Sequence, residues 1–100
     1  MTRDQIEAIT PEQILTEEQL ARLSPNGTKL YLAVWKIMAE RGESTVRAKD
    51  DLVSRRGRLP MQFIPEAQVE LAKAGLLILL PGSNETSYEY VEFEESEELG

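Results

Sequence analysis

Residues 63–80 read FIPEAQVELAKAGLLILL, a helical pattern that stops at Gly75 and turns into an apolar run. Pro65 is tolerated only in the first turn of a helix, so the regular helix is predicted over residues 65–74. Gly75 permits the left-handed cap that ends this helix, and the apolar run after it is consistent with a covered strand. The positions at helical spacing that are predicted to face the core are Ile64, Ala67, Leu71 and either Ala74 or Gly75.

A second strand is predicted after this run. Residues 81–86 read PGSNET and form a polar loop, and residues 87–93 alternate in a way that is typical of a strand. Two strands joined by a polar loop make a hairpin. Residues 94–100 are acidic and poor in apolar groups, so they are predicted to be a disordered tail.

The chain before residue 63 is predicted to supply the supporting helices. Residues 28–41, TKLYLAVWKIMAER, are almost wholly apolar between Leu30 and Ala39, which indicates a core helix that could also serve as a dimer seam, with Gly42 as its stop. A brief edge strand is predicted within residues 43–48, and a short helix over residues 49–56 that Gly57 ends.

Two helix starts are predicted near the N-terminus. Thr10 with Gln13, and Thr16 with Gln19, each have the hydroxyl and amide spacing of a capping box. The apolar residues that follow give one or two short helices in an N-terminal extension, residues 1–24.

Composition limits the classes of protein that fit. The chain has 100 residues, 41% hydrophobic and 29% charged, which is typical of one globular domain. Histidine and cysteine are absent, so the commonest general base, the thiol nucleophile and the usual zinc ligands are missing. No catalytic site, metal or cofactor is therefore predicted. The sequence has no signal-peptide pattern and no apolar stretch of spanning length, so a cytoplasmic protein without membrane association is expected.

The net charge of −7 is unevenly distributed. Residues 83–100 contain seven glutamates and no basic residue, and residues 1–24 contain five acids and two bases. Residues 25–82 contain nine bases and six acids. The middle of the chain is thus mildly basic, although the protein as a whole is too acidic for one that coats nucleic acid.

The order helix, strand, short helix, helix, strand, loop, strand resembles the winged helix-turn-helix superfamily, most closely at Leu71, Gly75, Leu76 and Leu77. The resemblance implies a mainly helical α+β fold, with a winged-helix domain at residues 25–93 and a two-stranded wing. It also implies a small DNA-binding transcriptional regulator, which is expected to form a homodimer through residues 30–39 or through the N-terminal extension. In that superfamily the second helix of the turn motif enters the major groove of double-stranded DNA. The groove-facing positions here are Gln62, Phe63, Pro65, Glu66 and Val69, followed by Glu70 and Lys73.

The sequence is compatible with two kinds of partner, double-stranded DNA and another protein. For DNA, Gln62 is the natural base reader, and five basic residues nearby suit phosphate contacts: Arg47, Lys49, Arg55, Arg56 and Arg58. Glu66 and Glu70 would repel phosphate, which favours the alternative of a non-enzymatic protein-interaction module. That module would bind a protein partner through Phe63, Pro65, Val69, Tyr88 and Tyr90.

Overall fold

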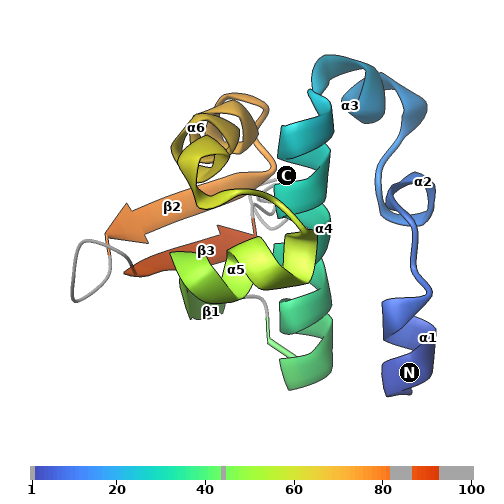
Figure 1. Ribbon diagram of the computed structural model, residues 1–100. Helices are drawn as coiled ribbons and strands as arrows, with labels where there is room; N and C mark the ends of the chain where they lie inside the picture. The colour runs from blue at the N-terminus through green and yellow to red at the C-terminus, as the bar shows by residue number, and fades with distance from the viewer. Residues whose placement is uncertain (1, 44, 82–86, 93–100) are drawn as a thin grey trace, which may run out of the picture.

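The computed structural model describes residues 2–43, 45–81 and 87–92, and it has a mainly helical α+β fold (Figure 1). In chain order the elements are α1 (Arg3–Glu7), α2 (Pro11–Ile14), α3 (Glu17–Arg22), α4 (Pro25–Arg41), β1 (Thr45–Lys49), α5 (Asp50–Gly57), the 3₁₀ turn η1 (Met61–Phe63), α6 (Ile64–Lys73), β2 (Leu77–Pro81) and β3 (Ser87–Glu92). In Figure 1, α4 stands between the sheet on one side and α1–α3 on the other.

The three strands form one antiparallel sheet in the order β1-β3-β2. β3 is the central strand: it pairs Val91 with Thr45 of β1, and Glu92 with Leu77 of β2. β1 is therefore an edge strand, as predicted, and β2 and β3 form the predicted antiparallel pair. Their connection and the predicted acidic tail lie outside the described residues.

The core is built around α4. Its apolar residues are covered by α5, α6, the sheet and the N-terminal helices, so a dimer seam along Leu30 to Ala39 would have little apolar surface to use. The buried side chains of α4 are Leu30, Tyr31, Ala33, Val34, Ile37 and Met38. Ser24 caps the helix by accepting a hydrogen bond from the Gly27 N–H, and Gly42 ends it in the left-handed conformation, φ 65°.

The helix α6 follows its prediction closely. Ile64, Ala67 and Leu71 are buried, and Gly75 has a φ of 71°. The prediction that Ala74 or Gly75 faces the core is wrong, because the helix ends at Lys73 and the chain turns outward before Leu76 re-enters the core. Gln68 is buried instead, a position that helical spacing of apolar residues does not identify.

The helix α5 differs from its prediction at both ends. Lys49 belongs to β1, so the helix begins at Asp50, and Gly57 is its last residue rather than its stop. Arg58 takes the left-handed conformation, with φ 53°, and is the one non-glycine residue with positive φ in the described part of the chain. The Ser54 hydroxyl donates to the Leu59 carbonyl oxygen at 2.6 Å, and the Leu59 side chain is buried in the core.

The N-terminal helices lie along α4. Both predicted starts are confirmed: the Gln13 and Gln19 side chains accept hydrogen bonds from the Thr10 and Thr16 N–H groups. The helix α1 was not predicted, and it packs on α4 through buried Ile6. None of the helices among residues 2–43, 45–81 and 87–92 has the length and apolar character that crossing a bilayer requires.

Candidate nucleic-acid interface

The C-terminal end of α5 lies directly against α4 because Gly57 has no side chain. A Cβ at Gly57 would be 3.2 Å from the Lys29 carbonyl oxygen and 3.3 Å from the Ala33 Cβ. Those distances are shorter than comfortable packing, so glycine sets how closely the two helices approach. The close approach brings the arginines of the α5 C-terminus beside the lysines of α4.

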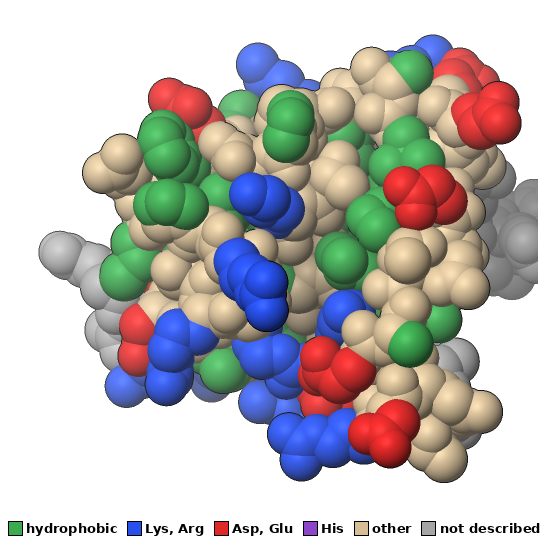
Figure 2. Space-filling view, turned by 45° about the vertical axis from the view of Figure 1, so that its right-hand side comes forward, with side chains coloured by type: hydrophobic (Ala, Val, Ile, Leu, Met, Phe, Trp, Pro, Cys, Tyr) green, Lys and Arg blue, Asp and Glu red, His purple; other side chains and the backbone are tan. Residues whose placement is uncertain are grey.

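A hollow of about 540 Å³ opens where α1, α4 and α5 meet. Leu32, Ala33 and Gly57 line it, and Glu7 is the only acidic residue that lines it in the described part of the chain. We call it the basic hollow, because six basic side chains also line it: Arg3, Lys29, Lys36, Arg55, Arg56 and Arg58. Figure 2 shows Lys and Arg side chains running from the centre of this face toward its lower edge.

Arg56 differs from its neighbours because its guanidinium is committed to two carboxylates. It lies 2.9 Å from Glu7 Oε1 and 2.7 Å from Glu40 Oε1, and its side chain is only 24% exposed. Arg3 adds a longer contact of 3.7 Å to the same Glu40. Arg56 therefore joins α1 to α4 and α5. Its guanidinium already binds two carboxylates, so it is not free to bind a phosphate.

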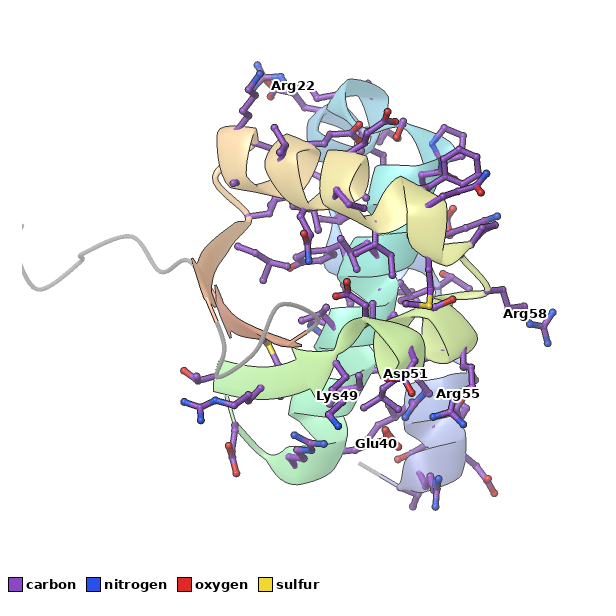
Figure 3. The ribbon with its side chains drawn as sticks, turned by 60° about the vertical axis from the view of Figure 1, so that its left-hand side comes forward. Arg22, Glu40, Lys49, Asp51, Arg55 and Arg58 are labelled. Carbon is purple, nitrogen blue, oxygen red and sulfur yellow. The ribbon has the colours of Figure 1, made fainter. Side chains whose placement is uncertain are left out.

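The other predicted phosphate contacts lie at the surface. The Arg55 side chain is 75% exposed and makes a long contact of 3.9 Å with Asp51. Arg58, Lys49 and Gln62 are also exposed, and neither Arg58 nor Lys49 has an ion-pair partner among the described residues. Arg47 is exposed on β1. In Figure 3, Arg58 extends away from the molecule, and Arg55 and Lys49 project from the same α5 and β1 layer.

Two acids interrupt this basic surface in the first turn of α5. The Oδ1 atom of Asp50 is buried and has no hydrogen-bond partner in the described structure. Burial, and secondarily the negative charge of Asp51, raises the pKa of the Asp50 carboxyl above its ordinary range. This carboxylate is thus an energetic cost rather than a ligand of the adjacent cations.

The outward side of α6 carries few groups that suit DNA. Pro65 and Glu66 are exposed, and Val69 is 54% exposed. Glu70 turns instead toward the start of α4, where its Oε1 accepts a hydrogen bond of 2.6 Å from the Ser24 N–H. Glu70, one of the two carboxylates expected to repel phosphate, is therefore engaged in a hydrogen bond within the protein.

The residues predicted for a protein partner are only partly brought together. Pro65 and Val69 share the exposed side of α6, and Met61, at 48% exposure, lies nearby in the chain on η1. Phe63 is half-buried and packs on the core. Tyr88 and Tyr90 belong to β3, but their side chains lie outside the part of the structure that is described.

Three members of the basic hollow were not anticipated from the sequence: Arg3, Lys29 and Lys36. The spacing of Lys29 and Lys36 is a partial signal, because residues seven apart lie on one face of a helix. Nothing in the sequence places that face beside the α5 arginines. Among residues 2–43, 45–81 and 87–92, no cluster of acidic, His or Cys side chains is arranged to hold a metal ion.

Comparison of the chain with protein-family models, curated proteins and solved structures found no match.

Proposed function

We propose that this chain is a winged-helix protein that binds double-stranded DNA mainly through the phosphate backbone, as a small regulator of transcription. The element order α4, β1, α5, α6, β2, β3 and the antiparallel β2–β3 pair support the winged-helix assignment. In this proposal α5 and α6 are the two helices of the turn motif, and β2 and β3 flank the wing.

The observation that carries the proposal is the gathering of exposed cations on β1 and α5. Arg47, Lys49, Arg55 and Arg58 would contact phosphates there, with Gln62 as the base reader. A local positive field attracts DNA even when the net charge of the protein is negative, because the field of distant charges is screened over about 8 Å at physiological salt. Arg56 has a positioning role, because it holds α1 against α4.

Weak sequence discrimination follows from the chemistry of α6. Its exposed residues offer Pro65, Glu66 and Val69 where a reading helix presents Arg, Asn or Gln. Phosphate contacts without base contacts give affinity that does not depend on sequence and that falls steeply with salt.

Fluorescence anisotropy with a labelled random duplex, measured from 25 to 200 mM salt, tests the proposal. We expect Lys49→Ala combined with Arg55→Ala and Arg58→Ala to weaken binding at least tenfold and to flatten the salt dependence. Arg22→Ala is the matched control, since Arg22 pairs with Glu18 on α3 and lies at the opposite end of the molecule in Figure 3. Absence of duplex binding at 25 mM salt would exclude this function.

The alternative is a protein-interaction module that uses the outer side of η1 and α6. It is supported by Met61 and Val69, the large hydrophobic residues that are exposed in the described part of the chain. Affinity purification from the source organism with the native chain and with Val69→Glu tests it. A stoichiometric partner lost only in Val69→Glu supports the alternative, and equal recoveries contradict it.

A homodimer, if formed, must use a surface other than the apolar side of α4, which is buried within the chain. Sedimentation equilibrium between 5 and 500 μM measures this directly. A monomer mass throughout contradicts a dimeric regulator, and it leaves the DNA-binding proposal to be decided by anisotropy.

A further inference from the structure

The basic hollow holds more positive charge than the described protein neutralises. Its lining has six basic side chains and one carboxylate, Glu7. Arg56 is paired with Glu7 and Glu40, Arg3 has a longer contact with Glu40, and Arg55 has one with Asp51. Lys36 donates to the Glu7 carbonyl oxygen at 2.9 Å, an uncharged acceptor. The side chains of Lys29 and Arg58 have no hydrogen-bond or ion-pair partner in the part of the chain that the structure describes. Solvent and salt screen part of the repulsion between these exposed cations, and a bound anion would be attracted by the positive charge that is left.

Arg58 supplies a second, independent observation. It is held at φ 53°, a left-handed conformation that costs a non-glycine residue free energy and that glycine adopts without cost. Strained residues of this kind are concentrated at binding sites, where the contacts of the side chain with a ligand offset the strain of the backbone. The position requires a residue that tolerates this backbone, yet the chain has a long cation there, at the rim of the hollow.

The size and rigidity of the basic hollow indicate the class of ligand. A volume of about 540 Å³ lies in the range of small-molecule sites. Its walls are fixed by the close contact of Gly57 with α4 and by the pairing of Arg56 with Glu7 and Glu40. Duplex DNA presents a wide convex backbone that would contact the rim, whereas a compact anion with several charges could enter.

From these observations we propose that the basic hollow binds a compact oligophosphate, either free inorganic triphosphate or the triphosphate group of a nucleotide. Lys29, Lys36 and Arg58 contact the phosphate oxygens, and Arg55 closes the outer edge. Arg56 is a positioning residue, because its guanidinium keeps α1 and Glu7 in place. This site shares Arg55 and Arg58 with the DNA surface proposed above, whereas Lys29 and Lys36 belong to the hollow alone and Lys49 to the DNA surface alone.

Isothermal titration calorimetry of the full chain at 150 mM salt, with inorganic triphosphate, ATP and orthophosphate as separate titrants, tests the proposal. We expect saturable one-to-one binding of inorganic triphosphate and ATP, and binding of orthophosphate at least tenfold weaker. The variant Lys29→Ala with Arg58→Gly should weaken triphosphate binding at least tenfold. Arg58→Gly relieves backbone strain as it removes the cation, so loss of binding in a variant that unfolds no more easily is not explained by misfolding.

The matched control is Arg22→Ala with Lys73→Ala, which removes two positive charges outside the hollow. Retained binding in this control supports the site, and an equal loss in both double variants overturns it as a general charge effect. Absence of saturable triphosphate binding, or orthophosphate binding as tight as triphosphate binding, also overturns it.

The two triphosphate titrants distinguish the source of the ligand. Equal affinities for ATP and inorganic triphosphate indicate that the site contacts only the phosphates, and tighter ATP binding indicates that it contacts the nucleoside as well. Lys49→Ala should weaken duplex binding but leave triphosphate binding unchanged, so the two proposals can fail separately.

Discussion

The carboxylate of Glu70 occupies the space beside Gly27 that the Cβ of any other residue would need. From that position Glu70 Oε1 accepts the Ser24 N–H at 2.6 Å, while the Ser24 hydroxyl accepts the Gly27 N–H at 3.1 Å. The start of α4 is thus capped twice, once by its own N-cap residue and once by α6. A negative charge at a helix N-terminus is also favourable to the helix dipole.

Gly27→Ala should have opposite effects in two backgrounds. In the native chain the new methyl displaces Glu70 and breaks its hydrogen bond to Ser24, a loss of about 1.5–3 kcal/mol that exceeds the gain of about 1 kcal/mol from replacing glycine in a helix. In the Glu70→Ala background only the gain remains, so Gly27→Ala should raise the free energy of unfolding. Urea denaturation of the four proteins measures this coupling, and additive effects would contradict it.

Arg55 and Arg56 are adjacent in sequence but should contribute unequally to stability. Arg56→Ala leaves Glu40, whose side chain is 19% exposed, without its 2.7 Å partner, so we expect a loss of about 1–3 kcal/mol. Arg55→Ala removes a contact of 3.9 Å between exposed groups, and the expected change is within about 0.5 kcal/mol. Urea denaturation of the two single variants makes the comparison. Equal losses in the free energy of unfolding would show that the contacts of Arg56 with Glu7 and Glu40 do not stabilise the fold.

Asp50 should make stability depend on pH in a defined direction. Its pKa is raised in the folded state above the ordinary value of 3.8, chiefly by burial, so its favourable contribution is complete below that ordinary value and is lost as pH rises through the folded value. Asp50→Asn should therefore raise the free energy of unfolding at pH 7 and have little effect at pH 3. Thermal unfolding at both pH values tests this, with Asp51→Asn as the exposed neighbour for comparison. A larger gain at pH 3 than at pH 7 would reverse the sign and refute the assignment.

Arg58→Gly should stabilise the chain by about 0.5–1 kcal/mol, because glycine adopts a φ of 53° without the penalty that arginine has there. Part of the benefit is offset by the greater freedom of glycine in the unfolded state. Arg58→Lys retains both the strain and the charge, so its melting temperature should match that of the native chain. A melting temperature of Arg58→Gly below that of Arg58→Lys would contradict the strain argument.

The parts of the fold that could be predicted are those specified by neighbours in the chain. Helix ends at Gly42 and Gly75, and helix starts at Thr10 and Thr16, follow from capping residues that act over three or four positions. The apolar spacing of Ile64, Ala67 and Leu71 identified the core side of α6 for the same reason.

The parts that could not be predicted depend on contacts between distant segments. Whether Arg55 or Arg56 is engaged is decided by Glu7 and Glu40, which lie on other helices. The basic hollow likewise exists only because Gly57 lets α5 lie against α4 beside Lys29. Local sequence rules carry no information about such pairings.

The central place of β3 has a consequence for how the chain acquires its structure during synthesis. Thr45 of β1 and Leu77 of β2 lie opposite Val91 and Glu92 of β3, which the ribosome adds after both. A nascent chain that ends before β3 holds two strands with open edges, while α4, α5 and α6 can already associate. The helical part is thus free to assemble first, and the sheet closes in a later step that has a high contact order.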